Sequence, residues 1–189
     1  MRALAVVIAS LLALAFDSSF GGIFTLRYAG FVTPLAMPCI VVFVSLFAPQ
    51  TQALMSAIIF GILVDLSPGH GELLGGAHLV GPYALGYFMT ALLIVKVRNV
   101  VFRRRVLTIV MFCTGSVIVV GATHALVLIV RGMLPWTPPV VGGGFMGLIL
   151  LLGTAIYSGL LAVPLGWCLL STIGLWKFHS PTGRRATWR

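Results

Sequence analysis

The chain is a succession of apolar runs separated by short polar or basic segments. Within each run the apolar residues are nearly continuous, whereas strands of a membrane barrel alternate apolar and polar positions over about ten residues. The pattern predicts an all-α bundle of about six transmembrane helices, with residues 1–175 as one domain and 176–189 as a short basic cytoplasmic tail. The predicted helices cover residues 3–20, 28–47, 53–66, 73–97, 106–130 and 140–170.

Prolines fall inside three of these runs and are expected to bend the helices, because each removes a backbone N–H and crowds the preceding turn. Pro34 and Pro38 lie in the first half of the second run, and Pro82 lies in the fourth. Pro164 is the expected break in the sixth run, which is longer than the roughly 20 residues that a membrane crossing needs.

Small residues recur at a spacing of four in two of the runs. The first run carries Ala5, Ala9 and Ala13, and the sixth carries the pair Gly143 and Gly147. A stripe of this kind allows a neighbouring helix to approach closely. These five residues are therefore candidate helix-packing positions, within the chain or against a partner.

The first run permits two interpretations. The segment from Ala3 to Phe16 is short for a membrane crossing, and Ala13-Leu14-Ala15 is similar to a signal-peptide cleavage site. Alternatively, it is a retained helix that continues to about Phe20. We prefer the retained helix, since Asp17 can then lie at the membrane interface.

Composition supports a membrane protein. Hydrophobic residues make up 60% of the chain, charged residues only 8%, and the mean hydropathy is +1.14. A soluble domain could not bury that much apolar surface. The net charge of +9 is carried by residues between and after the apolar runs, so it indicates membrane topology and contact with anionic lipid headgroups, not nucleic-acid binding.

The basic residues also predict an orientation. Six crossings would place both termini on one side, and only Arg27 and Arg131 would lie on the other side. The positive-inside rule makes the richer side cytoplasmic, as expected for a multi-pass protein of an inner (plasma) membrane. The predicted cytoplasmic set is Arg2, a basic loop of Lys96, Arg98, Arg103, Arg104 and Arg105, and the tail residues Lys177, Arg184, Arg185 and Arg189.

The most polar stretch is the hairpin of residues 60–87, which holds two of the three acidic residues and two of the four histidines. Asp65 lies in the last turn of its predicted helix, where the helix dipole disfavours a carboxylate. A partner or water is therefore expected for it. Asp65 would then fix the hairpin, form part of a partner surface, or simply reach interfacial water. The candidate partners are Arg27, Arg131, His70 and His78.

Candidate chemistry is sparse. Asp65, His70, Glu72 and His78 do not match the spacing of a standard metal site. Ser116 and His124 are eight residues apart, well off one helix face, and no base is apparent for the serine. The three cysteines, Cys39, Cys113 and Cys168, are widely spaced within apolar runs, which argues against disulfides and zinc. We therefore expect no catalytic, cofactor or metal site, and a scaffold or adaptor instead of an enzyme.

Several residues between about 10 and 135 resemble the rod shape-determining protein MreD family. The resemblance rests on a glycine and an aspartate closing one helix, a glycine-rich turn and an aromatic in the next helix, here Gly61, Asp65, Gly69, Gly71 and Tyr87. Glu72, His70 and the long sixth run with its basic tail depart from the family pattern.

This resemblance implies a non-enzymatic inner-membrane component of the bacterial cell-elongation machinery. It implies binding to the bitopic protein MreC, and help in organising peptidoglycan synthases with MreB filaments to set cell shape. The five motif residues are then candidate partner contacts. The basic loop would meet anionic lipid or an acidic partner surface.

An alternative is the substrate-binding membrane component of an energy-coupling-type vitamin transporter. That family is also a six-helix bundle of this size, and it docks through small residues in its first helix, to which Ala5, Ala9 and Ala13 are similar. The polar hairpin could admit a ligand. Against this alternative, a vitamin site needs several convergent polar groups, and few are present.

Overall fold

The computed structural model describes residues 3–20, 23–26, 32–67, 80–98, 105–133 and 144–176, and every named element in these ranges is helical. An isolated bridge between Leu26 and Val32 is the only β contact in this part. The predicted all-α class is therefore confirmed. The elements are α1 (Ala3–Ala15), η1 (Phe16–Phe20), α2 (Met37–Phe47), α3 (Gln50–Asp65), α4 (Pro82–Val97), α5 (Val106–Gly132), α6 (Gly144–Ser171) and α7 (Ile173–Trp176).

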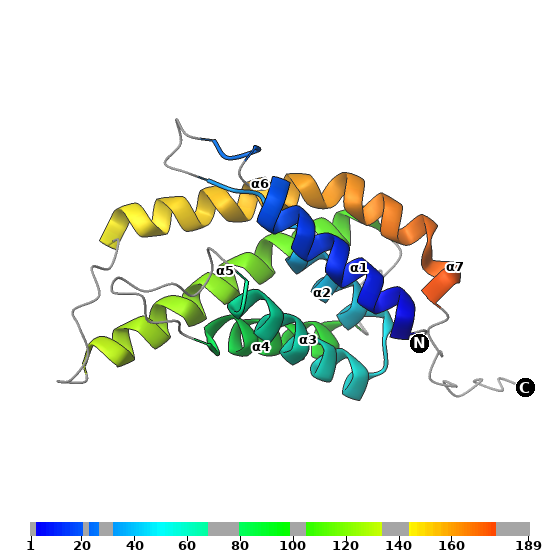
Figure 1. Cartoon of the computed structure of the whole chain (residues 1–189), viewed down its shortest axis with the longest axis horizontal. Helices are drawn as coiled ribbons and strands as arrows, with labels where there is room; N and C mark the ends of the chain where they lie inside the picture. Colours follow the sequence, from blue (N-terminus) through cyan, green and yellow to red (C-terminus); the bar gives the residue numbers. More distant parts are fainter. Residues whose placement is uncertain are drawn as a thin grey trace, which may run out of the picture.

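The short helix α2 is the centre of the fold. Each of its residues from Met37 to Leu46 is buried, and α1, α3, α4, α5 and α6 all pack against it (Figure 1). At its far end the ring of Phe43 meets the edge of Trp176 in α7, with ring centroids 5.0 Å apart. The bundle is thus organised around α2, and not around the polar hairpin that is most conspicuous in the sequence.

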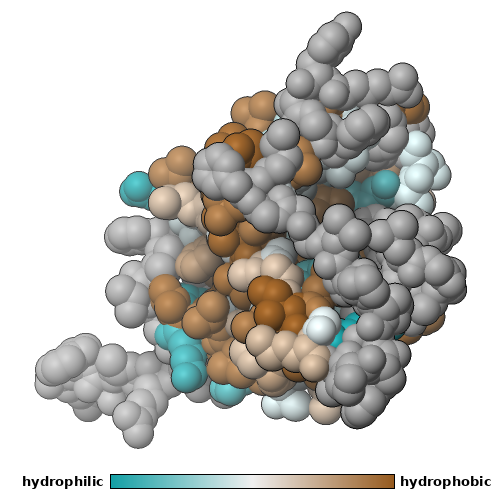
Figure 2. Space-filling view, turned by 90° about the vertical axis from the view of Figure 1, so that its left-hand side faces the viewer, coloured by the Kyte–Doolittle hydropathy of each residue, from teal (hydrophilic) through white to brown (hydrophobic). Residues whose placement is uncertain are grey.

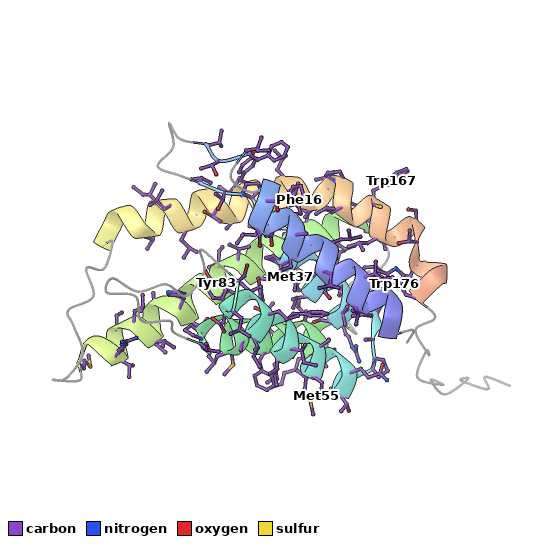
Figure 3. All side chains as sticks on the ribbon, in the orientation of Figure 1. Phe16, Met37, Met55, Tyr83, Trp167 and Trp176 are labelled. Atoms are coloured by element: carbon purple, nitrogen blue, oxygen red, sulfur yellow. The ribbon has the colours of Figure 1, made fainter. Side chains whose placement is uncertain are left out.

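Within the described ranges, two helices are long and apolar enough to cross a membrane, namely α5 and the Gly147–Ser171 part of α6. Only 28% and 22% of their most apolar 18-residue windows are buried, so neither resembles the core helix of a soluble protein. Met55 on α3 and Trp167 on α6 point away from the bundle, 60% and 70% exposed (Figure 3). Exposed apolar faces on α1, α3, α4, α5 and α6 favour a lipid environment.

Two helices begin later than the hydrophobic pattern predicts. The segment from Val32 to Ala36 is not helical, and α2 begins only at Met37. Likewise Gly81, with φ of +130°, precedes α4, which begins at Pro82. Pro38 and Pro82 lie in the first helical turn, where the missing N–H has no intrahelical partner to lose. These prolines therefore start helices, and do not bend them as expected.

Pro164 does not end the last long helix, and a bend of the helix there stays a prediction. Helix α6 continues through Pro164 to Ser171. Membrane helices tolerate an internal proline where neighbouring groups satisfy the released carbonyl. Trp176, the first residue of the predicted tail, is buried against α2, so the packed bundle reaches residue 176. Residues 177–189 lie outside the described part.

Candidate functional site

Asp65 is fully buried and caps the neighbouring helix. Its Oδ2 accepts the backbone N–H groups of Gly81 (2.9 Å) and Ala84 (3.2 Å), and its Oδ1 accepts that of Tyr83 (3.3 Å). These donors form the N-terminus of α4, where the helix dipole favours a negative charge. Among the described residues, Asp65 thus binds three backbone donors, and its expected pairing with a cation or histidine stays a prediction. Arg27, His70 and His78 lie outside the described residues.

The close packing of α3 on α4 makes this cap possible. Gly61 lies one turn before Asp65, and a Cβ placed there would collide with the Ala84 backbone. Gly81 supplies the left-handed backbone conformation that turns its N–H toward the carboxylate. Gly61 and Asp65 therefore form one interhelical joint with the start of α4, which we call the α3–α4 joint. Tyr87, 1% exposed, lies farther along α4.

Burial changes the role expected for these motif residues. Gly61, Asp65 and Tyr87 are buried within the chain, so their contribution to a partner surface would be indirect for the two α3 residues, and the candidate partner contacts stay a prediction. What they can do is fix the angle and separation of α3 and α4. Gly69 and Gly71, the other two motif positions, lie outside the described residues.

Asp17 does for α2 what Asp65 does for α4. It lies in η1, directly after α1, and its carboxylate accepts the N–H groups of Ala36 (2.6 Å) and Met37 (2.9 Å). The expectation that Asp17 reaches the membrane interface is replaced by this cap on a buried helix. The extended segment before α2 is also held by α6, since Leu35 N–H donates to Ser158 Oγ at 3.0 Å.

Arg98 binds the opposite end of α2. Its guanidinium donates to the carbonyl oxygens of Ser45 (3.2 Å) and Ala48, which close the C-terminus of α2. A cation there complements the negative end of the helix dipole. Arg98, expected to be part of the basic loop, is thus a structural cap, whereas Lys96 and Arg105 are exposed as expected. Arg103 and Arg104 lie outside the described part.

We expect Arg98→Met to lower the unfolding midpoint of the purified protein, because two carbonyls at the end of a buried helix lose their donor. The loss is about 1–3 kcal/mol, the usual range for a buried polar group left unpaired. Lys96→Met, an exposed cation in the last turn of α4, is the matched control and should leave the midpoint unchanged. Circular dichroism during heating in mild detergent measures both, and equal midpoints would contradict the capping role.

Asp17, but not Asp65, lines a small crevice between η1, α3 and α4. Asp17, Ser67, Tyr83 and Tyr87 contribute to the lining of a cavity of about 10 Å³, a volume that suits about one water molecule. At its edge the hydroxyl oxygens of Ser18 and Ser67 are 3.0 Å apart, which links η1 to the end of α3. The carboxylate in this crevice, Asp17, already accepts two backbone N–H groups.

A much larger hollow of about 1100 Å³ lies between α5 and α6. The two helices pack closely where Gly159 meets Thr114 and Gly121 meets Leu151, and they separate beyond those contacts (Figure 1). A Cβ added at Gly132 or Gly147 would meet nothing within 4 Å. We call this hollow the α5–α6 groove. It is lined by Thr33, Leu35, Pro38, Tyr83, Tyr87, Val117, Val120, Gly121, Ala122, His124, Ala125, Leu128, Ile129, Gly132, Gly147, Leu148, Leu150, Leu151 and Thr154.

Some of the candidate helix-packing residues pack against other helices of this chain, and others do not. Ala13 belongs to the core and Ala9 packs against it, so this stripe serves packing within the chain. Gly147 has no close neighbour among the described residues, and its use against a partner stays a prediction. Gly143 and the Ala5 side chain lie outside what the structure describes.

Groups that could carry catalysis are not assembled in the described part of the chain. Ser116 Oγ is buried without a hydrogen-bond partner, and His124 faces the ring of Tyr83 at 5.3 Å. The described ranges hold no group of three or more potential metal ligands. Cys39 and Cys113 are unbridged buried thiols with their Sγ atoms 3.1 Å apart, a proximity that sequence spacing did not indicate.

Sequence reasoning identified Asp65 as important but missed its donors, and it missed the roles of Asp17 and Arg98. The available signal was the pair Pro38 and Pro82, because a proline often marks the first turn of a helix. The N–H groups of that turn lack intrahelical partners and need an acceptor such as Asp17 or Asp65. No family model, curated protein or solved structure matches this chain.

Proposed function

We propose that this protein is a multi-pass, non-enzymatic adaptor of a bacterial inner membrane, related in function to MreD of the cell-elongation machinery. It would bind an MreC-like bitopic protein and help control peptidoglycan synthesis and cell shape. The observation that carries the proposal is the α3–α4 joint. Two residues of the family-like motif, Gly61 and Asp65, meet the start of α4 there, and a third, Tyr87, is buried farther along α4.

The nature of that joint favours an adaptor. A catalytic motif exposes its reactive group to a substrate, whereas Asp65 is fully buried and bonded to three backbone N–H groups. A motif of this kind maintains the relative position of α3 and α4. A rigid helical hairpin with apolar outer faces is suited to present a fixed surface to partner helices in a bilayer.

The partner surface should then lie on outward-facing helix sides. Leu11 and Leu12 on α1 and Ile156, Leu160 and Trp167 on α6 are exposed. Ala9 and Ala13 are turned inward and are therefore unsuitable. The exposed cations Lys96 and Arg105 fit a cytoplasmic surface that meets anionic lipid, in the orientation that the positive-inside rule gives.

The α5–α6 groove favours a second candidate, the substrate-binding component of an energy-coupling-type transporter. Its volume of about 1100 Å³ is slightly above the roughly 300–1,000 Å³ that is typical of small-molecule sites. Its polar side chains are few, namely Thr33, Tyr83, Tyr87, His124 and Thr154. This scarcity is unfavourable for a water-soluble vitamin and keeps the adaptor as the first choice.

Affinity purification of the tagged protein from mild-detergent membranes, followed by mass spectrometry, tests the proposal. We expect an MreC-like bitopic protein and cell-wall synthases among the captured proteins. Trp167→Ala and Leu160→Ala test the exposed α6 face, with the exposed Met55→Ala on α3 as a control. A loss of capture with the α6 variants alone would assign that face to the partner.

Two outcomes would contradict the adaptor role. Capture of an ATPase and a transmembrane coupling subunit would support the transporter component instead. Capture of no membrane partner, with normal cell width after deletion of the gene, would also reject it.

A further inference from the structure

Two thiols from distant parts of the chain meet inside the bundle. Cys39 is on α2 and Cys113 is on α5, 74 residues farther along the chain, yet their Sγ atoms are only 3.1 Å apart. Both side chains are fully buried, and both thiols are free. Two cysteines can be bridged without movement of the backbone only where their side chains already point toward each other, and these two satisfy that condition.

The two thiols lie where three helices meet. The Cys113 thiol donates a weak hydrogen bond to the carbonyl oxygen of Ser158 on α6, over 3.8 Å. The Oγ of the same serine accepts the N–H of Leu35, in the segment that leads into α2. Ala162, about one turn farther along α6, belongs to a small buried cluster with both cysteines. A covalent bond between the thiols would therefore fix the central helix α2 against α5 beside their common contact with α6.

The surroundings of the thiols favour a disulfide over a metal site. A structural zinc ion takes four protein ligands, and a catalytic one takes three. The described ranges hold no group of three or more potential metal ligands, so the pair is not completed by another histidine, cysteine or carboxylate there. Two adjacent thiols alone are what a disulfide needs.

A small, uncharged oxidant has a route toward the pair. Cys39 directly follows Pro38, and Cys113 precedes Val117 by about one helical turn. Pro38 and Val117 both line the α5–α6 groove. Figure 2 faces the end of the molecule at which α5 and α6 separate, and the described surface there is mainly hydrophobic. Entry from this side disfavours charged reagents, and the buried thiols are reached when groove-lining side chains move.

We propose that Cys39 and Cys113 are a redox-sensitive pair, which a peroxide oxidises to a disulfide that ties α2 to α5. One sulfur attacks a peroxide oxygen, the O–O bond breaks, and the sulfur becomes a sulfenic acid while its proton leaves in water. The second sulfur then attacks the sulfenic sulfur, so that the S–S bond forms and the S–O bond breaks, and the hydroxyl leaves with the second thiol proton as water. The 3.1 Å separation favours this second step over further oxidation. The pair does not depend on which protein partner is bound.

The test uses the full chain, purified in mild detergent, reduced with a phosphine and then treated with hydrogen peroxide. Remaining thiols are alkylated after denaturation, and mass spectrometry identifies linked peptides. We expect a peptide pair joined through Cys39 and Cys113. The thermal midpoint, followed by circular dichroism, should rise by about 5–15 °C and return after renewed reduction, because the bond links residues that are 74 positions apart.

Cys168→Ala is the matched control, because Cys168 is the exposed cysteine and lies on α6. It should keep both the bridge and the rise in midpoint. Cys39→Ala and Cys113→Ala each leave one member of the pair and should abolish both. Circular dichroism checks that each variant is folded, and the linked peptides of the wild-type chain identify the pair without any variant.

Complete alkylation of Cys39 and Cys113, under peroxide treatment that oxidises the exposed Cys168, would overturn the redox pair. Bridges that form only through Cys168 would overturn it as well. A bridge between Cys39 and Cys113 without a rise in the midpoint would contradict the fixing of α2 against α5. Failure of the partner-capture experiment would leave each of these results unchanged, so the redox pair and the adaptor role are tested separately.

Discussion

Asp65→Ala is expected to destabilise the protein by at least about 3 kcal/mol, the combined cost of leaving three buried N–H donors without an acceptor. Those donors belong to Gly81, Tyr83 and Ala84 and all bind the one carboxylate. Removing a buried acceptor costs more than removing an exposed cap, because neither water nor lipid reaches the site to replace it. The measurement is the thermal midpoint of the purified protein in mild detergent, followed by circular dichroism.

Asp65→Asn removes the negative charge but keeps nearly the same side-chain shape. The amide oxygen can take the place of Oδ2 and keep the bonds from Gly81 and Ala84, while the bond from Tyr83 is lost. We therefore expect a clearly smaller loss than for alanine. Leu66→Ala, at an adjacent and 60% exposed position, is the control and should have little effect.

Partner capture should follow the stability of the hairpin in these variants. Because Asp65 is enclosed by the chain, it influences a partner only through the position of α3 and α4. Asp65→Ala should therefore weaken capture more than Asp65→Asn does. If Asp65→Asn kept wild-type stability but lost partner capture completely, this explanation would be contradicted. A direct contact between Asp65 and the partner would then be indicated.

Gly61→Ala is expected to have the second large effect, a loss of about 1–3 kcal/mol, typical of overpacking a tight contact. The added Cβ would overlap the backbone of Ala84 and approach the Tyr83 carbonyl oxygen at 2.8 Å. Backbone atoms cannot rotate away as a side chain can, so α4 must move from α3. That movement also pulls the N–H groups away from Asp65.

Gly115→Ala makes the same chemical change inside a helix with no neighbour within 4 Å of the new Cβ. It should be neutral, or stabilising by up to about 1 kcal/mol, since alanine favours the helix over glycine. The double variant Gly61→Ala with Asp65→Ala should cost less than the sum of its parts, because both disrupt one joint. Strict additivity would show that the glycine contact and the cap are independent.

The sequence by itself determined the class of this protein. Continuous apolar runs and the shortage of charge predicted a helical bundle, and the structure confirms the helices and the absence of strands among the described residues. The reason is that helix formation and apolar exposure depend on local composition. The same local reasoning identified Asp65 as a carboxylate that needs a partner.

Only the tertiary structure decided how the polar groups are satisfied. Asp17, Asp65 and Arg98 bind backbone groups that are 19, 16 and 50 residues away in sequence, for the closest bond of each. The packing of α2 within the bundle determines which charged side chain lies at which helix end. Apolar runs are too uniform in sequence to predict that packing. The α5–α6 groove likewise exists because two helices diverge beyond Gly121, a property of their contact and not of either sequence alone.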